Sequence, residues 1–546
     1  MAGPQRPAER STHERSAHAL SATREALLAL YQRIEHAFDA AFTSGQNPLR
    51  QLGTLAFLMF WLLVASGIYL YIAIDTSASG AYPSIDSLSR QAWLPGAILR
   101  SVHRYAADAF VVLMLAHLLR EWLFGRYHGF RRFSWLTGVP LLLFAFVCAI
   151  GGFWLNWDQL GQFSAIATAE LLDWLPLFAT PLARNFLSNA AVTDRLFSLF
   201  VFIHLGVPLL LVFGLWFHIQ RISRAMVFPS RSLTLASCAT LLALAALRPV
   251  LSHAPADLAV VPAALELDWL LLFTHPLMYA TSAGIVWLLL GAALLTLIAL
   301  PYLQQSAAPV PVAVVDPDNC NGCRRCFDDC PYAAVTMVPH PKRRIARQMA
   351  QVDTDLCASC GICVGACPSS TPFRGATELI TGIDMPSAPI GALRQRLKDA
   401  LAALPGSPKI VAFGCDRGAH VQALAAPDVA AFSLICIGML PPSFIEYALR
   451  DGADAVLVSG CREGGCEFRL GQRWTAQRLS GAREPHLRAA VPSERIATVW
   501  ADAGDESALR SALEALRARL AAFEHAALQP RPRSTAFAAQ SGATLP

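Results

Sequence analysis

The sequence predicts a chain of several domains. We expect an all-α transmembrane bundle, with a four-helix core plus two further spans, then a small α+β domain and a small α/β domain with a parallel sheet. Of the 546 residues, 54% are apolar and 15% are charged, and the apolar stretches of membrane length fall within the first 302 residues. Two runs of four cysteines follow residue 319. From Lys409 onward, apolar runs alternate with helical stretches, which is typical of a parallel sheet.

The beginning of the chain is polar, and the charge of the whole chain is modest. The formal net charge of +5 gives no reason to expect a nucleic-acid partner. About the first 22 residues lack the apolar core of a signal peptide. Residues 23–43 have helical apolar periodicity, so we expect residues 1–45 to hold a tail and an amphipathic helix along the membrane surface.

Six apolar stretches approach the length that a bilayer requires, although the fifth is short. They cover residues 50–73, 104–124, 135–155, 197–220, 232–248 and 280–302. Arginines concentrate in the loops after the second and fourth stretches, whereas acidic residues concentrate in the opposite loops. The positive-inside rule then predicts a multi-pass protein of the bacterial inner membrane, with both termini and the cysteine-rich part in the cytosol.

Two pairs of histidines stand out in the second and fourth stretches. His103 and His117 are 14 residues apart, and so are His204 and His218. On an α-helix this spacing is almost four turns, so each pair shares one face and is separated by about 21 Å. Ionisable side chains are costly in a membrane, and neutral imidazole is a ligand of haem iron. If the helices are parallel, His103 opposes His204 and His117 opposes His218, which predicts two stacked b-type haems.

Glycines in the first and third stretches have the same spacing. Gly53 and Gly67 are 14 residues apart, as are Gly138 and Gly152. A glycine allows a bulky group to approach the backbone closely, so these positions suit a four-helix bundle around two macrocycles. The alternative is that the glycines pack helix against helix and that the histidines are isolated interior side chains.

These residues resemble the cytochrome b subunit of the bc-type quinol-oxidising complexes over about residues 30–302. The segments "RSVHRYAADAF", "RRFSWLTGV" and "GGFWLNWDQLGQF" match that family in register. The resemblance implies a dihaem core over residues 46–225, and two further helices with an outer quinol-site loop over residues 226–303. It also implies that Arg100 and Arg120 pair with haem propionates.

The same resemblance implies a quinol site. "ELDWLLLF" resembles the family's Pro-Glu-Trp-Tyr segment, with Asp268 in the position of the glutamate. Trp157 and Asp158 stand where the family has Pro-Trp-Gly-Gln or Pro-Trp-Asp-Gln. A carboxylate there could accept a proton from quinol. The chain departs from the family at Leu267 and Asn156, which replace prolines, and a solvated loop carboxylate is the alternative for Asp268.

The first cysteine-rich segment carries a duplicated spacing in which each run ends in proline. Its eight cysteines are Cys320, Cys323, Cys326, Cys330, Cys357, Cys360, Cys363 and Cys367. The spacing resembles bacterial two-cluster ferredoxins and implies a ferredoxin-like domain over residues 304–375 with two [4Fe–4S] clusters. In that family the fourth cysteine of each run binds the other cluster. One set would therefore be Cys320, Cys323, Cys326 and Cys367, and the other Cys357, Cys360, Cys363 and Cys330. Zinc is the alternative.

A linker or helix over residues 376–408 precedes the third cysteine site. Three predicted strands end at Cys415, Cys436 and Cys461, and Cys466 follows closely. Ligands at the carboxyl ends of parallel strands converge. The segment from Cys436 to Gly471 resembles the delta subunit of methyl-viologen-reducing hydrogenases, which implies one [2Fe–2S] cluster within residues 409–525. Zinc is again the alternative, and residues 526–546 have the composition of a disordered tail.

The order of these sites predicts a quinone-reactive redox subunit of an oxidoreductase complex. Electrons would pass between the quinone pool and a cytosolic heterodisulfide-reductase-like flavoprotein, or another cytosolic oxidoreductase. One alternative is a subunit of a bc-type complex with a Rieske protein and cytochrome c. Another is an interaction or assembly module with structural metal sites. In each case we expect a homodimer or membership of a larger complex.

Overall fold

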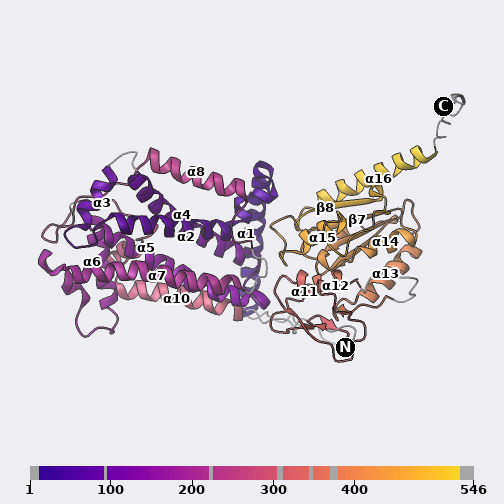
Figure 1. Cartoon of the computed structure of the whole chain (residues 1–546), viewed down its shortest axis with the longest axis horizontal. Coiled ribbons are helices and arrows are strands. Elements are labelled where there is room, and N and C mark those ends of the chain that lie inside the picture. Colours follow the sequence, from indigo (N-terminus) through magenta and orange to yellow (C-terminus); the bar gives the residue numbers. More distant parts are fainter. Residues whose placement is uncertain are drawn as a thin grey trace, which may run out of the picture. The chain divides into compact units, whose positions relative to one another are not determined.

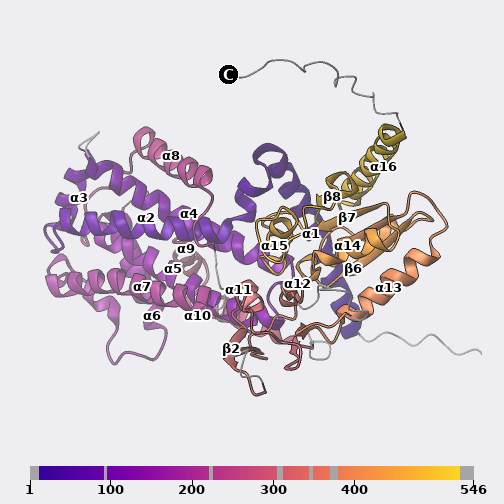
Figure 2. The ribbon, with the colours of Figure 1, turned by 45° about the vertical axis from the view of Figure 1, so that its right-hand side comes forward.

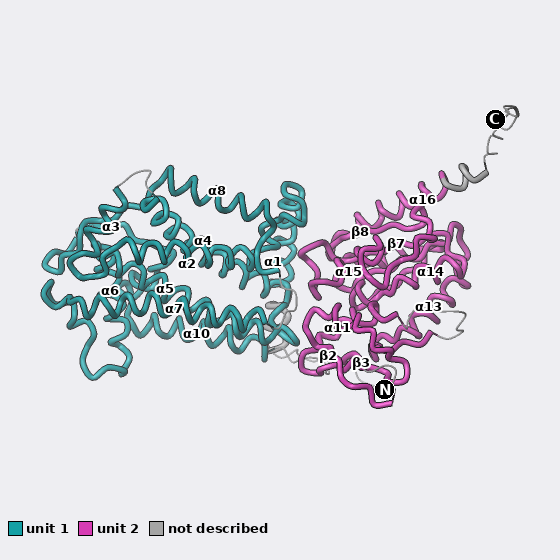
Figure 3. The backbone as a smooth tube through the Cα atoms, viewed as in Figure 1, with its two compact units in different colours: residues 1–309 teal, residues 310–546 magenta. Residues whose placement is uncertain are grey.

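The chain separates into two compact units, residues 1–309 and 310–546 (Figure 3). The computed structural model describes residues 12–90, 95–220, 226–262, 264–303, 311–342, 348–368 and 379–528. Residues 304–310 and 369–375 of the predicted ferredoxin-like domain, residues 376–378 of the predicted linker, and residues 529–546 of the predicted tail lie outside these residues. The two units are described separately below.

The first unit is helical. Its helices are α1 (Thr12–Phe42), α2 (Leu52–Ala73), α3 (Ala81–Arg90), α4 (Pro95–Leu123), α5 (Arg132–Asn156), α6 (Gln159–Asp173), α7 (Asp194–Gln220), α8 (Arg231–Leu247), α9 (Thr274–Ala280) and α10 (Ala283–Leu303). Helices α2, α4, α5, α7 and α10 run side by side (Figures 1 and 2). Among the described helices, these five, with α5 extended by the short turn before it, are long and apolar enough to cross a membrane. The protein is a multi-pass membrane protein.

The fifth predicted span, residues 232–248, was expected to be short, and the structure agrees. It forms α8, which has only 17 residues and falls below the length of a full span. Nevertheless, its two ends are anchored far apart on the bundle. The backbone N–H of Ser230 donates to Gln51 beside the start of α2, and Tyr105 in the first half of α4 donates to the carbonyl of Arg248. Because α2 and α4 are antiparallel, α8 extends from one end of the bundle to the other.

The second unit begins with a small β region that carries cysteines. Strand β1 (Val314–Val315) pairs with β4 (Ile383–Asp384), and β2 (Val335–Pro339) pairs with β3 (Gln348–Val352), both antiparallel. Two one-turn helices, α11 (Arg325–Asp329) and α12 (Ile362–Gly365), carry Cys326 and Cys363. The duplicated cysteine spacing is therefore matched by a duplicated local structure.

The remainder of the second unit is a four-stranded parallel sheet in the order β6-β5-β7-β8. The strands are β5 (Ile410–Cys415), β6 (Val429–Leu434), β7 (Ala455–Gly460) and β8 (Ile496–Trp500), and the helices are α13 (Ile390–Ala403), α14 (Ser443–Arg450), α15 (Gly471–Leu479) and α16 (Glu506–Leu528). Strands β5 and β7 are buried throughout, as expected for a sheet covered on both faces. Val411 and Phe413 pack into the core with α13 and α14, whereas Ile410 and Ala412 pack with α16. The predicted fold class is confirmed.

Candidate haem and iron–sulfur sites

His103 of α4 and His204 of α7 lie opposite each other. The ring centroids of His103 and His204 are 6.3 Å apart, with 62° between the ring planes. A bond between a metal ion and an imidazole nitrogen is about 2 Å long, so two imidazoles on opposite sides of one metal have centroids about 6 Å apart. The separation of these rings therefore matches that of two axial ligands of one iron.

The outer ring nitrogens of the ligand candidates have partners in the neighbouring helices. His103 Nδ1 lies 2.9 Å from Ser66 Oγ, and His218 Nδ1 lies 3.1 Å from Thr137 Oγ1. His204 Nδ1 donates to the carbonyl of Cys148 at 2.9 Å. Such contacts fix the orientation of a ring and leave Nε2 for the metal.

These partners were not identified from the sequence. A short polar side chain directly precedes Gly67 and Gly138, at Ser66 and Thr137, and this pattern could have revealed two of the contacts. Cys148 had no such signal, because it contributes a backbone carbonyl that any residue type could provide.

Each of the four predicted glycines faces one of the four histidines. A methyl group added to Gly67 would lie 3.1 Å from His103 Cε1, and one on Gly152 would lie 3.1 Å from His204 Cε1. At the other end of the bundle, a methyl group added to Gly53 would lie 3.3 Å from His117 Cε1, and one added to Gly138 would lie 3.2 Å from His218 Cε1. The glycines thus allow the imidazoles themselves to lie against the backbone of α2 and α5.

The two arginines predicted to bind propionates have protein partners in the structure. Arg100 donates to Ser89, to Asn156 Oδ1 at 3.1 Å and to Ser252 Oγ at 3.0 Å. Arg120 is buried, and its Nε donates to Glu35 of α1 at 2.8 Å. The propionate role of both arginines stays a prediction.

Glu35 belongs to a buried polar network at the end of the bundle that contains His117. Asp39, one turn further along α1, accepts hydrogen bonds from Arg50 at 2.7 and 3.0 Å and from Asn47 at 2.7 Å. The predicted helix over residues 23–43 is present within α1. Glu35 and Asp39 pair with arginines that lie before α2 and near the end of α4, so α1 is fixed to the bundle through charge.

The predicted quinol-site residues make defined contacts at the opposite end. Asp268 forms an ion pair with Arg104, which also pairs with Asp108 four residues along α4. The other Asp268 oxygen accepts the backbone N–H groups of Leu270 and Leu271 at 3.0 and 2.8 Å. The carboxylate is therefore held in one orientation beside the residue that follows His103.

Asp158 and Trp157 have structural contacts of their own. Asp158 caps the start of α6 by accepting the N–H of Gly161 at 2.9 Å, and it accepts the N–H of His253 at 3.0 Å. Trp157 has a left-handed backbone (φ 44°) and packs against Phe197 and Phe200. Both side chains are buried, so they shape the loop between α5 and α6.

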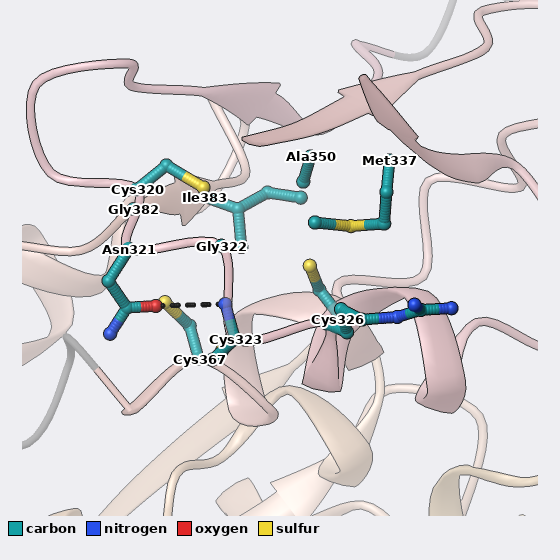
Figure 4. Close-up of a pocket in the computed structure, with 11 residues that line it drawn as sticks. Cys320, Asn321, Gly322, Cys323, Cys326, Met337, Ala350, Cys367, Gly382 and Ile383 are labelled. Atoms are coloured by element: carbon teal, nitrogen blue, oxygen red, sulfur yellow. Dashed lines mark hydrogen bonds between the residues drawn. The ribbon is translucent and has the colours of Figure 1, made fainter. Parts of the chain in front are cut away.

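In the second unit, the four cysteines assigned to the first cluster line one pocket (Figure 4). Cys320, Cys323 and Cys326 come from the first run, and Cys367 comes from the end of the second run. Gly322 has φ +70° and allows the loop to turn around the pocket. Burial raises the pKa of Cys326 to about 12, so a metal would be needed to hold this ligand as a thiolate.

The complementary set also gathers in one place. The charge of Cys330 acts on Cys360 and Cys363 of the second run, and that of Cys357 acts on Cys330, Cys360 and Cys363. The backbone N–H of Ala334 donates to Cys330 Sγ at 3.3 Å. Cys330 therefore lies near the cysteines of the second run, and the crossed assignment of the fourth cysteines stays a prediction.

The third cysteine set lies at the carboxyl ends of β5, β6 and β7. The sulfur atoms of Cys415 and Cys461 are 3.9 Å apart. Thiol hydrogen bonds also join Cys436 to Cys415 and Cys466 to both Cys436 and Cys461. The hydrogen bonds from Cys436 and Cys461 hold the pKa of Cys415 below its usual value. The four cysteines therefore lie close together at one edge of the sheet, and their role as ligands of one group stays a prediction.

The fold and these sites define a membrane cytochrome b that carries iron–sulfur domains and serves as an electron-transfer subunit. Comparison with known proteins gives the particular combination. A cytochrome b/b6/petB family model matches residues 41–226, a 4Fe-4S dicluster domain matches residues 319–371, and the methyl-viologen-reducing hydrogenase delta subunit family matches residues 410–523. The chain thus contains these three domains in one polypeptide. The first match implies b-type haem and the second implies a 4Fe-4S dicluster.

One solved structure is also similar in part. A chain described as "Hyperthermophilic respiratory Complex III" is 20% identical to this one. The alignment covers 50% of this chain and 81% of that chain, with a TM-score of 0.40.

Proposed function

We propose that the protein exchanges electrons between the quinone pool and a cytosolic oxidoreductase. In this proposal two b haems, two [4Fe–4S] clusters and one [2Fe–2S] cluster form the path, and the partner is a heterodisulfide-reductase-like flavoprotein. A haem supplies reversible one-electron chemistry to the site that binds it. The chain's own residues set where the groups are held and how water and protons reach them.

The observation that carries the proposal is the geometry of the histidine sites. Two rings at the separation of axial ligands, each with its Nδ1 fixed, favour haem over isolated interior histidines. Four glycines that each admit one imidazole support two such sites. The role of His103, His117, His204 and His218 as ligands is part of this proposal.

Quinol oxidation also needs a proton acceptor, since quinol loses two protons as it loses two electrons. We assign Asp268 as the acceptor of one of these two protons. Its pairing with Arg104 stabilises the charged carboxylate, and the backbone N–H groups that it accepts hold it in place. Trp157 and Asp158 would shape the adjoining loop rather than accept protons, because Asp158 is committed to capping α6.

The partner and the membrane orientation follow from the sequence. Arginine-rich loops favour a cytosolic location for both termini and for the iron–sulfur domains. The sequence has no recognisable flavin or nicotinamide motif, so a further subunit must complete the reaction, and the delta-subunit match favours a flavoprotein. The protein would act as a homodimer or within a larger complex in the bacterial inner membrane.

Optical spectroscopy of the purified protein tests the proposal. Reduced-minus-oxidised spectra are expected to show b-haem bands that a quinol analogue reduces. His117→Ala and His218→Ala are each expected to remove the same haem signal, whereas the matched control His253→Ala, outside α4 and α7, is expected to leave both signals intact. Iron without protohaem in the wild-type protein would refute the membrane part of the proposal.

A second candidate function is a subunit of a bc-type complex, which the cytochrome b match favours. In that case a Rieske protein and cytochrome c are expected to copurify with the full-length chain. Copurification of a flavoprotein that takes electrons from the iron–sulfur domains would instead support the first proposal.

A further inference from the structure

Arg478, on α15 of the second unit, is a fully buried cation with three partners from distant parts of the chain. Its side chain is 1% exposed and pairs with Asp329 at 2.5 Å. Nη1 donates to the carbonyl of Gly438 at 2.9 Å, and Nη2 also lies 3.5 Å from the carbonyl of Ile362. Figures 1 and 2 show α11, α12 and α15, which carry or adjoin these groups, lying side by side.

Each of these partners is close in sequence to a cysteine. Asp329 directly precedes Cys330, and Ile362 directly precedes Cys363, which belong to the same predicted four-cysteine set. Gly438 is two residues after Cys436, which belongs to the third set. A single guanidinium therefore contacts the backbone beside two different cysteine sites.

The two cysteine sites approach each other through glycines. A methyl group on Gly365 of α12 would clash with the carbonyl of Gly438 and lie 2.7 Å from Arg478 Nη1. A methyl group on Gly438 would lie 2.8 Å from the Cα of Gly471. Backbone therefore meets backbone between α12 and the short helix Ile437–Met439, which keeps the two sites as near to each other as the chain allows.

A purely structural ion pair does not account for the charges here. Asp329 also pairs with Arg483 at 3.1 Å, and the Arg483 guanidinium stacks on Trp474 with its central carbon 3.4 Å from a ring centroid. In the part of the chain that the structure describes, this one carboxylate faces two guanidinium groups. Burying an unbalanced cation is costly unless negative groups lie nearby. Metal–thiolate groups in the adjacent cysteine sites would provide that negative charge.

We propose that Arg478 is a positioning residue that couples the two cysteine sites. It holds α12 against the third site, and its charge favours the reduced, more negative state of the group in each. This inference rests on the proposed function. The exchange that it assists is a transfer of one electron, in which one group is oxidised, the other is reduced and no proton is released.

Redox titration of the full-length protein, followed by electron paramagnetic resonance, tests the inference. In Arg478→Gln, the ratio of reduced to oxidised centre at a fixed potential is expected to fall at least tenfold, which corresponds to 59 mV for a one-electron couple. The fall should affect the group held by Cys330 and Cys363 and the group in the third site. The group in the pocket of Cys320 and Cys367 is an internal reference and should change less.

Asp329→Asn is expected to shift the ratio of reduced to oxidised centre in the opposite direction. Removing this negative charge while keeping the side-chain shape is expected to raise the same two ratios. The matched control Arg488→Gln, an exposed arginine paired with Glu446, should change none of them. If Arg478→Gln fails to fold, Asp329→Asn still decides the question.

The outcomes separate the inference from the function on which it rests. Unchanged ratios in both variants, or shifts of the same sign, would overturn the role of Arg478 while the proposed function stands. Absence of the iron–sulfur signals from the wild-type protein would instead refute the proposed function. Iron content of each variant shows whether its groups are present at full occupancy.

Discussion

Replacing Gly152 by alanine is expected to weaken haem binding at one site only. The added methyl group would lie 3.1 Å from Cε1 of His204, closer than ordinary van der Waals contact. Gly67→Ala would create the same 3.1 Å contact with His103, from the other side of the pair. Both variants should therefore perturb the same haem, because His103 and His204 face each other.

The expected cost follows from two opposing effects. Forcing an extra methyl group into a packed site typically costs about 1–3 kcal/mol. Alanine also favours the helix over glycine by about 0.5–1 kcal/mol. The net cost is about 1–2 kcal/mol, which corresponds to about a five- to thirtyfold loss of haem affinity, since 1.4 kcal/mol is a factor of ten.

Haem titration into apoprotein, with redox-difference spectra of each variant, measures this loss. Gly53→Ala and Gly138→Ala should affect the other haem, since their contacts are with His117 and His218. Gly206→Ala on α7 is the matched control, because a methyl group there meets no described atom within 4 Å apart from its own helix backbone. The reasoning would be refuted if Gly67→Ala and Gly152→Ala perturbed different haems, or if the control weakened binding equally.

Three further predictions follow from particular contacts. Asp268→Asn is expected to slow quinol oxidation at least tenfold in a stopped-flow assay while the b-haem spectrum stays intact; a normal rate would remove its proposed role. Cys367→Ser should abolish the same electron paramagnetic resonance signal as Cys320→Ser, whereas Cys330→Ser should abolish a different signal. Loss of the same signal in all three variants would contradict the crossed assignment of the cysteines. Glu35→Ala should destabilise the protein by about 3 kcal/mol in thermal or denaturant unfolding, since it removes a buried ion-pair partner of both Arg120 and Arg50. An unchanged unfolding midpoint would count against that network.

The parts of the structure that depend on local periodicity could be predicted from the sequence. A separation of 14 residues places two side chains on one face of any regular helix, so the shared face of His103 and His117, and that of Gly53 and Gly67, needed only helical geometry. The parallel sheet was predictable for a similar reason. Continuous apolar runs separated by helical stretches are typical of a parallel sheet covered on both faces, and the structure contains a four-stranded parallel sheet in this region.

The contacts that were not predicted join residues far apart in sequence. Arg120 pairs with Glu35, 85 residues earlier, and no periodic signal relates the two. The partner of Arg478 is 149 residues away. Each of these contacts depends on how distant segments pack together, which the residue types alone do not reveal.

In both units, glycines, which lack a Cβ atom, allow side chains or backbone to approach closely at the proposed metal sites. In the first unit, Gly67 and Gly152 admit the edges of imidazole rings, and in the second, Gly365 and Gly438 admit another segment of backbone. In the second unit both sides of the contact are main chain, which deforms far less readily than a side chain changes rotamer. Substitutions at these glycines should therefore alter haem affinity or redox potentials before they lower global stability, which distinguishes them from glycines that merely pack helices.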